Sequence, residues 1–580
     1  MNLLKIKYTE ILKRNTALEK IFFDHHYDIS VLSNIVNTQL NEILEYALRI
    51  ENIPAQVQSG NYDNIVQGSL QYKDSKAIII FWELCNLKDG LQYKVQLFDD
   101  DRFDEILNKT KSEIDLVLKN LQDSTLVLFN KFTSLPFSNV NIIRNNLDKL
   151  ALQLNQYLEE RILANIRLVD IEKVIYKVGL EKSLDMRYYY SSKALYTVDF
   201  FKSYANYVKP FFMSANGKSK KALIFDCDNT LWKGILGEDG FDNIKMTPET
   251  KEGEIFYEIQ KLALDLNNQG ILIGLCSKNN PGDVDEVIKF HPGMQLREDH
   301  IAINKSNWND KVSNLKEMAN ELNIGLDSIV FVDDSSFEVN LVREQLPEIT
   351  VLQVPERLYE YPYMLRENIG LFYNLSFTDE DRKKTEMYKH QVKRENVKEE
   401  FSDIEDYLAS LELKMTIYQD DEEIIPRMSQ MSQKTNQFNL KTKRYTESDI
   451  KNYIISEDSK VIAFSVSDKY GDSGITGLCI LDIDDSIQTA EIDTYLMSCR
   501  IIGRNIEYAF MDYLITLIER NKINIVQAKY IKTQKNEQVK DFYNNCGFNL
   551  IDRNESERTY ELDSINYVPK NLKYIGIVNG

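Results

Sequence analysis

The sequence predicts an α/β protein of three domains, and three observations lead to this prediction. A chain of 580 residues and 67.7 kDa is too long for a single hydrophobic core. Up to about residue 370, short apolar runs alternate with helical patterns, which is typical of parallel sheets covered by helices. Beyond residue 400 several strand-like runs follow one another, which indicates an α+β domain. The predicted domains cover 1–215, 216–375 and 401–580, with a connecting helix at 376–400.

The composition excludes several classes of function. Hydrophobic residues make up 43% and charged residues 28% of the chain, as in folded soluble proteins. The net charge of −20 argues against nucleic-acid or membrane-surface binding. Six cysteines without a CxxC pair indicate a reducing compartment and no structural zinc. The first residues lack a signal-peptide core and no apolar run reaches about 18 residues, so a cytoplasmic location is expected.

An acidic motif follows a short apolar run in the middle of the chain. Residues 222–225 have the pattern of a buried parallel strand, and Asp226, Asp228 and Thr230 come directly after it. Reaction sites in open α/β sheets lie at the carboxyl ends of the strands. Two carboxylates one residue apart repel each other unless a cation or a shared proton holds them. The DxDxT pattern therefore predicts metal-assisted phosphoryl transfer, and the alternative is an acidic turn after a core strand.

Three further segments supply what such a site needs. A strand at 271–276 ends before Ser277 and Asn279, and a helix begins at Lys311. Another strand at 328–332 ends before Asp333 and Asp334. An anionic nucleophile that attacks an anionic phosphate needs local positive charge, which a lysine and a divalent metal supply. The four-part series resembles the haloacid dehalogenase (HAD) superfamily.

The HAD resemblance implies a role for each of these residues. Asp226 is expected to be the nucleophile that becomes an aspartyl-phosphate, and Asp228 the general acid and base. The implied ligands of Mg²⁺ are Asp226, Asp228, Asp333 and Asp334. The implied phosphate-binding residues are Thr230, Ser277, Asn279 and Lys311. The intervals between these motifs are too short for an inserted cap domain, so we expect an open site whose lid comes from another domain or a macromolecular partner.

The N-terminal domain carries a second set of polar residues after strands. Ser33, Gly60 and Asn86 follow its first three predicted strands, in an order that resembles the SGNH hydrolases. Such a hydrolase needs a histidine base late in the domain. The histidines of the chain are His25, His26, His291, His300 and His390. We therefore expect a flavodoxin-like or SGNH-like scaffold without catalytic activity.

The C-terminal domain resembles the GNAT acyltransferases. Its RIIGRN segment, with Arg500 and Gly503, matches the RxxGxG/A loop that binds the pyrophosphate of coenzyme A at a helix N-terminus. Asn505 replaces the final small residue, so coenzyme A binding stays open. The segment 433–445 is rich in amide, hydroxyl and cationic donors, which indicates a grip on a small anion or, alternatively, a capped turn between helices. The acyl- or pantetheine-binding candidates are Gln433, Asn436, Asn439, Arg444, Arg500, Gly503, Asn536 and Tyr543.

Together, five segments resemble the FkbH-like proteins, which join an HAD domain of subclass IIIC to a GNAT-like domain. They are DCDNTLWKGILGEDG, FVDDSSFE, TEMY, QKTNQFNLKTKRYT and SCRIIGRNIE, and the resemblance covers about residues 20–560. It implies loading of a glyceryl unit from 1,3-bisphosphoglycerate, or a related acyl phosphate, onto the thiol of a separate acyl carrier protein. Dephosphorylation and a place in polyketide-type biosynthesis are also implied.

The thiol chemistry leaves more than one route open. Cys499, beside cationic Arg500, and Cys227, between two aspartates, are candidates for a relay thiol. The alternative for Cys227 is packing within the sheet, and direct attack by the carrier thiol needs neither. Two other functions compete. One is a Mg²⁺-dependent phosphatase or acyltransferase that acts on another phosphorylated metabolite or sugar, with the GNAT-like part as a lid. The other is a non-catalytic scaffold that docks a carrier.

Overall fold

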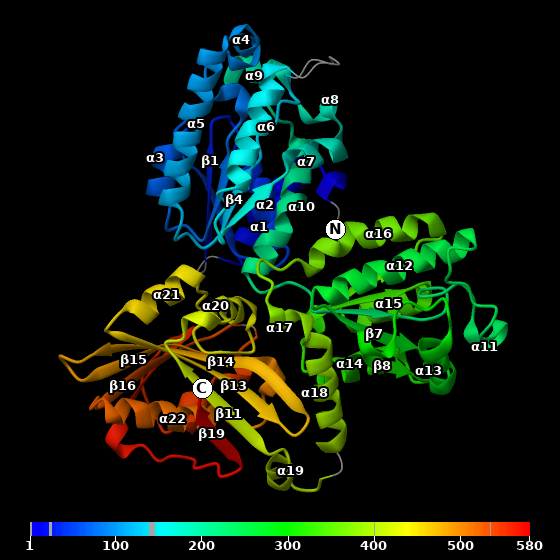
Figure 1. Cartoon of the computed structure of the whole chain (residues 1–580), viewed down its shortest axis with the longest axis vertical. Helices are drawn as coiled ribbons and strands as arrows, with labels where there is room; N and C mark the ends of the chain where they lie inside the picture. The colour runs from blue at the N-terminus through cyan, green and yellow to red at the C-terminus, as the bar shows by residue number, and fades with distance from the viewer. Residues whose placement is uncertain (1–2, 23–25, 138–144, 399–400, 534) are drawn as a thin grey trace. The chain divides into compact units, whose positions relative to one another are not determined.

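The computed structural model describes residues 3–22, 26–137, 145–398, 401–533 and 535–580. It divides into two compact units, Met1–Asn216 and Gly217–Gly580, coloured along the chain in Figure 1. None of the helices in the described part of the chain is long and apolar enough to cross a membrane. His25 and residues 399–400 of the predicted connecting helix lie outside the described residues.

The first unit is built on a parallel sheet of five strands in the order β2-β1-β3-β4-β5. The strands are β1 (Tyr27–Ser33), β2 (Ala55–Ser59), β3 (Ala77–Phe81), β4 (Val127–Asn130) and β5 (Ile166–Val169). The helices are α1 (Tyr8–Glu19), α2 (Thr38–Arg49), α3 (Ile65–Gln71), α4 (Leu91–Lys94), α5 (Asp100–Asn120), α6 (Asn146–Glu159), α7 (Ile171–Val178), α8 (Leu180–Ser183), α9 (Met186–Ser192) and α10 (Val198–Ala215). Every residue of β3 is buried, because helices cover both faces of the sheet.

The second unit begins with another five-stranded parallel sheet, in the order β10-β9-β6-β7-β8. Its strands are β6 (Ala222–Phe225), β7 (Leu272–Ser277), β8 (Ile301–Ser306), β9 (Ile329–Asp333) and β10 (Thr350–Gln353). Its helices are α11 (Leu236–Asp239), α12 (Lys251–Asn268), α13 (Pro281–Phe290), α14 (Lys311–Glu321), α15 (Ser336–Gln345) and α16 (Tyr361–Asn368). Separate apolar clusters pack on the two faces, which is the doubly wound arrangement.

The rest of this unit carries a large mixed sheet in the order β17-β18-β16-β15-β14-β13-β11-β19. The strands are β11 (Leu413–Gln419), β12 (Phe438–Asn439), β13 (Ser459–Asp468), β14 (Gly471–Asp484), β15 (Thr489–Met497), β16 (Ile525–Ile531), β17 (Asn549–Arg553), β18 (Glu557–Asp563) and β19 (Ile575–Asn579). The helices are α17 (Asp379–Arg382), α18 (Lys384–Lys398), α19 (Ile404–Ser410), α20 (Ile425–Lys434), α21 (Glu447–Ile455), α22 (Ile506–Arg520) and α23 (Phe542–Asn545). These sheets confirm the predicted α/β fold class with a mixed C-terminal sheet.

Strands β15 and β16 pair only along part of their length. The parallel pairing runs from Thr489 with Ile525 to Ile492 with Ala528. Beyond this point β15 pairs with the short strand β12 instead, through Leu496 and Met497. A segment of the chain therefore lies between the separating ends of the two strands.

The C-terminal part contacts the parallel sheet at the edge where its strands begin. Asn267, which precedes β7, donates a hydrogen bond of 2.8 Å to the hydroxyl of Thr385. Asp327, which precedes β9, forms an ion pair with Lys535. Tyr388 of α18 packs in the same apolar cluster as Leu315 of α14. These contacts therefore lie away from the opposite edge of the sheet, where the strands end.

Candidate active site

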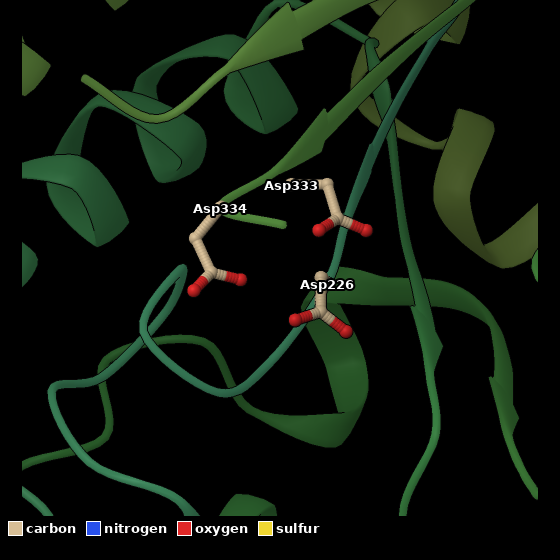
Figure 2. Close-up of side chains that lie close together, drawn as sticks. All are labelled: Asp226, Asp333 and Asp334. Atoms are coloured by element: carbon tan, nitrogen blue, oxygen red, sulfur yellow. The ribbon is translucent and has the colours of Figure 1, made fainter. Parts of the chain in front are cut away.

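An acidic centre lies at the carboxyl ends of β6 and β9. Asp226 follows β6, Asp333 ends β9, and Asp334 comes next in the chain. The strands are neighbours, and the backbone N–H of Asp226 donates to the carbonyl of Val332 at 2.9 Å. Oxygen atoms of the three carboxylates lie within 4.8 Å of one another, as Figure 2 illustrates. The register of two parallel strands therefore brings Asp226 to a pair of acids that lies more than 100 residues later in the sequence.

Lys311 supplies the positive charge at this centre. Its Nζ lies 2.9 Å from Asp226 Oδ1 and 2.6 Å from Asp333 Oδ2. The helix α14 begins at this residue because the carboxylate of Asp310 caps it, accepting the N–H of Ser313 at 2.8 Å. Burial opposes the charge of the Lys311 ammonium, but the two aspartates outweigh it and raise its pKa.

The acids outnumber the lysine, and their pKa values reflect this excess. Burial, together with the charge of Asp333, raises the pKa of Asp226 to about 6 although Lys311 opposes the shift. Burial likewise raises the pKa values of Asp333 and Asp334. A divalent cation would stabilise all three carboxylates, and clustered carboxylate oxygens are the donors that Mg²⁺ prefers. The residues present therefore fit a magnesium ion.

Asp228 stands apart from the three clustered acids and is held in one orientation. Its Oδ1 accepts hydrogen bonds from the indole N–H of Trp232 at 2.9 Å and the backbone N–H of Leu236 at 3.0 Å. Its Oδ2 accepts from the side chain of Asn279 at 3.0 Å. These bonds leave a carboxylate fixed in orientation near the centre, and a carboxylate can give and take protons. The contact of Trp232 with Asp228 was not predicted from the sequence, although the spacing of four residues between them was a usable signal.

The other predicted phosphate-binding residues border the same strand ends. Ser277 is buried at the end of β7 near Asp226, and its hydroxyl accepts a hydrogen bond from Asn279 at 3.1 Å. Thr230 is also buried, and its hydroxyl has no hydrogen-bond partner in the described structure. A buried, unpartnered hydroxyl at this place suits a ligand oxygen. The structure thus brings the predicted HAD residues together at one edge of the sheet.

Cys227 differs from its neighbours on either side. Its side chain is fully buried in the apolar cluster on one face of the sheet. Burial, together with the charge of Asp226, raises the pKa of the Cys227 thiol well above its usual value. A thiol in such surroundings packs as a small apolar group, in line with the packing alternative.

Cys499 and Arg500 belong to the C-terminal part, where Asn323, after the end of α14, donates to the carbonyl of Cys499. Cys499 is the only partly exposed cysteine among the six, which all belong to the described residues. Arg500 is buried, with Nη1 at 2.8 Å from the sulfur of Met387 and Nη2 at 3.7 Å from Glu380. Gly503 has a φ of 84°, and Asn505 a φ of 60° directly before α22, where its amide donates to the hydroxyl of Tyr574 at 2.8 Å.

Several residues of the donor-rich segment form hydrogen bonds within the segment or with the helix α20 that leads into it. Arg444 donates to the carbonyls of Ser432 and Thr435 and to the side chain of Asn436. Asn439 is buried and accepts the backbone N–H of Thr442 at 2.8 Å. The amide of Gln433 lies 3.4 Å from the hydroxyl of Ser429 on α20. These contacts shape a turn, which is the alternative that the sequence left open.

The two remaining candidates are also buried. Asn536 accepts the backbone N–H of Thr533 at 2.8 Å and donates to the carbonyl of Asn439 at 2.9 Å. Tyr543 packs against the rings of Phe548 and Tyr560. Both therefore support the strand β12 and its surroundings from within the fold.

Ser33, the serine that resembles an SGNH nucleophile, forms hydrogen bonds with a neighbouring residue of the chain. The hydroxyl of Ser33 donates to the carbonyl of Ile35 at 2.9 Å and accepts its N–H at 3.1 Å. The hydroxyl of Tyr189, on α9, donates to the side chain of Asn86 at 3.1 Å. The backbone N–H of Gly60 donates to the carbonyl of Val31. The polar residues that resemble an SGNH site are thus bonded to their own unit.

Comparisons with known proteins give matches among solved structures. No family model and no curated protein matches the chain. The N-terminal part of BF1531 from Bacteroides fragilis, which contains a phosphatase domain and was crystallised with Mg, is 26% identical to this chain. That match covers 63% of this chain and 99% of the other, with a TM-score of 0.54.

Two acetyltransferase structures also match, each over about a quarter of this chain. The ribosomal-protein-S18-alanine N-acetyltransferase from Escherichia coli is 14% identical, covering 27% of this chain and 97% of its own, with a TM-score of 0.22. The IAA acetyltransferase from Bacillus cereus is 12% identical, covering 26% and 99%, with a TM-score of 0.20. The chain thus joins a fold similar to that of a phosphatase-domain protein, in which an acidic triad is suited to a metal ion, to a mixed C-terminal sheet.

Proposed function

We propose that this chain is a magnesium-dependent enzyme of the HAD type that loads a glyceryl unit onto an acyl carrier protein and removes phosphate. The observation that carries the phosphoryl-transfer part is the gathering of Asp226, Asp333 and Asp334 around Lys311. The similarity to a phosphatase-domain protein crystallised with Mg supports it. The glyceryl part is supported by the resemblance of the motifs to the FkbH-like proteins.

The residues at the acidic centre suit phosphate removal in two steps. The carboxylate of Asp226 attacks the phosphorus atom, and the bond from phosphorus to the substrate oxygen breaks. Asp228 gives a proton to the departing oxygen and then takes one from the water that cleaves the aspartyl-phosphate. Lys311 holds positive charge beside the transferred group throughout. Magnesium, held by Asp226, Asp333 and Asp334, would neutralise the negative charge of the phosphoryl group.

The acyl step suits the thiol of Cys499. The thiolate attacks the carbonyl carbon of the acyl phosphate, the bond from carbon to the phosphate oxygen breaks, and phosphate leaves. The carrier thiol then attacks the enzyme thioester, and its proton returns to Cys499. The partial exposure of Cys499 supports this role, because a carrier thiol can reach it. The acidic centre removes the remaining phosphoryl group from the carrier-bound unit.

Intact-mass analysis tests the proposal. Wild-type protein is incubated with Mg²⁺, a 1,3-bisphosphoglycerate-generating system and a pantetheinylated carrier, and we expect a glyceryl adduct on the carrier. Asp226→Asn should leave the adduct phosphorylated, whereas Cys499→Ala should abolish it and Cys227→Ala should not. Phosphate release without any adduct on the carrier would contradict glyceryl transfer.

That last outcome would favour a second function, a phosphatase for another phosphorylated metabolite. The specific observation behind it is the position of the acidic centre. The contacts of the C-terminal part lie at the edge where the strands begin, whereas the aspartates lie where the strands end. The acidic centre is therefore built from the parallel sheet alone and can act without an acyl step. In these contacts the C-terminal part does not serve as the lid that the sequence suggested.

A further inference from the structure

A second cluster of charged side chains lies where the connecting helices meet the C-terminal part, on elements other than those of the acidic centre. We call four of its members the cation cluster: Lys384, Arg427, Lys434 and Arg500. They come from α18, α20 and the turn Cys499–Ile501, and they face two carboxylates on α17. When all four cations are protonated, the described members of this group therefore carry two positive charges in excess.

Two lysines of the cluster share one carboxylate oxygen. The Nζ of Lys384 lies 2.5 Å from Asp381 Oδ1, and the Nζ of Lys434 lies 3.4 Å from the same atom. The other oxygen of Asp381 accepts the side chain of Gln430 at 2.7 Å. The side chain of Asp381 is 1% exposed. A single buried charge thus balances two ammonium groups.

The two arginines share another carboxylate in the same way. Arg427 Nε lies 2.9 Å and Arg500 Nη2 lies 3.7 Å from Glu380 Oε2. The pair of Arg427 and Glu380 lacks hydrogen-bond geometry at these atoms, both of which are buried. The other oxygen of Glu380 accepts the backbone N–H of Ile475 at 2.9 Å. Arg427 also donates to the side chain of Gln430 and to the carbonyl of Ile475, which are both neutral acceptors. This half of the cluster is therefore also short of negative charge.

The charge excess shows in the pKa values of the cations. Burial lowers the pKa of Lys384, and repulsion from Arg427 and Arg500 adds to this effect although Asp381 opposes it. Burial and the charge of Lys384 lower the pKa of Lys434 well below its usual value. A bound anion would offset both the burial of the ammonium groups and the repulsion between the cations, since it would supply negative charge and acceptor atoms.

The cluster adjoins the thiol of Cys499. Arg500 is the next residue in the chain, and the hydroxyl of Tyr388 lies near the thiol. The side chains of Lys384 and Lys434 are 20% and 22% exposed, so an anion from solvent can reach them. A ligand held by the cations would therefore lie beside a partly exposed nucleophile.

We propose that the cation cluster binds the phosphoryl group of a phosphorylated acyl donor beside Cys499, at a site separate from the acidic centre. This inference rests on the proposed acyl transfer. A phosphoryl group carries about two negative charges and three acceptor oxygens, which match the excess of two positive charges and the donors of Arg427 and Arg500. A carboxylate, with one charge, would leave one cation unmatched.

Isothermal titration calorimetry of the full chain in the presence of EDTA tests this site, because EDTA removes the metal ion that the acidic centre needs. The probes are 3-phosphoglycerate, inorganic phosphate and glycerate at matched ionic strength. We expect the two phosphoryl compounds to bind and glycerate to bind at least ten-fold more weakly. Lys434→Met should weaken 3-phosphoglycerate binding at least ten-fold, whereas Lys434→Arg should restore it. Lys443→Met is the control, because Lys443 pairs with Asp493 outside the cluster.

The melting temperature is a second readout, which distinguishes loss of the binding site from misfolding of the variant. Removing one cation from a group with excess positive charge should leave the melting temperature of the ligand-free Lys434→Met protein unchanged or higher. Binding that survives in Lys434→Met but disappears in Asp226→Asn would overturn the inference and leave the phosphoryl-transfer function standing. Equal binding of glycerate would also overturn it. Phosphoryl binding at the cluster without any glyceryl transfer would instead count against the proposed function.

Discussion

Asn323 donates a hydrogen bond from its side-chain amide to the backbone carbonyl of Cys499. Asn323 follows the end of α14, and Lys311, the first residue of that helix, belongs to the acidic centre. The helix has 11 residues, which corresponds to a length of about 16 Å. The acidic centre and the thiol therefore lie at opposite ends of one helix, and a three-carbon substrate cannot contact both at once.

Asp226→Asn should abolish phosphate release, with a loss of about 1000-fold or more, because the amide is no nucleophile. The fold should be retained, since the new side chain has the same shape and removes one of three crowded carboxylates. Phosphate release in the presence of Mg²⁺ and circular dichroism measure the two effects. Normal turnover in this variant would remove the phosphoryl-transfer assignment.

Cys499 should be the first cysteine to react with iodoacetamide in the native protein. It is partly exposed, whereas the other five cysteines are buried. Burial also raises the pKa values of the Cys227 and Cys276 thiols, which disfavours their reactive thiolates. Peptide mass mapping after brief alkylation measures the order. Labelling of Cys227 at a comparable rate would show that the acidic loop opens in solution.

Mg²⁺ should raise the melting temperature of the wild-type protein, because it binds the folded acidic centre and not the unfolded chain. Asp334→Asn should weaken this effect, with about ten-fold lower affinity for the ion. Asp299→Asn, which changes a fully exposed acid elsewhere, provides the control. Thermal melts over a range of Mg²⁺ concentrations give both affinities, and an equal response of the two variants would contradict the assigned ligand set.

Lys311→Met should destabilise the metal-free protein in a pH-dependent way. Without the ammonium the pKa of Asp226 rises further above its value in the unfolded chain. When the pKa of a carboxyl is raised in the folded state, the free energy of unfolding of the protein falls as the pH increases towards that pKa. We expect a loss of about 3 kcal/mol in the free energy of unfolding at pH 8 and a smaller loss at pH 5.

Urea denaturation in EDTA at the two pH values measures this loss. Lys305→Met is a matched control, because Lys305 pairs with Glu317 and Glu321 at a more exposed place beside the same helix. Its effect should stay below about 1 kcal/mol at both pH values. A loss for Lys311→Met that grows towards low pH would contradict the ion-pair explanation.

Glu83 makes the N-terminal unit sensitive to pH. Burial raises the pKa of this carboxyl to about 8, although the hydroxyl of Tyr196 donates to it at 2.9 Å. Between pH 5 and 8 the folded unit therefore holds a proton that the unfolded chain releases, and its stability falls by up to about 1.4 kcal/mol per pH unit. Glu83→Gln should remove this dependence, measured by hydrogen exchange of β3 in the full chain, whereas the exposed Glu159→Gln should not.

The acidic centre is the part of the protein that the sequence described best. Asp226 follows β6 and Asp333 ends β9, and the carboxyl ends of neighbouring parallel strands lie side by side. The local sequence pattern and the expected parallel sheet were therefore enough to predict that these two acids lie close together. The helical start at Lys311 follows from the cap residue before it.

Features that depend on distant segments could not be read from the sequence. The pairing of Phe438 in β12 with Met497 in β15 joins parts of the chain that no local pattern links. The cation cluster likewise draws Lys384 and Arg500 to the same acids from separate elements. Charge excess of this kind is a property of the tertiary arrangement, and composition alone gave an acidic protein.

The position of Lys311 and Asn323 at the two ends of α14 has a consequence for the order of events. In the proposed reaction, the acyl unit on the carrier must leave the thiol of Cys499 before its phosphoryl group can reach the acidic centre at the other end of the helix. The sequence of steps would then be enforced by a mobile tether on the partner, with no need for the enzyme to change shape between them.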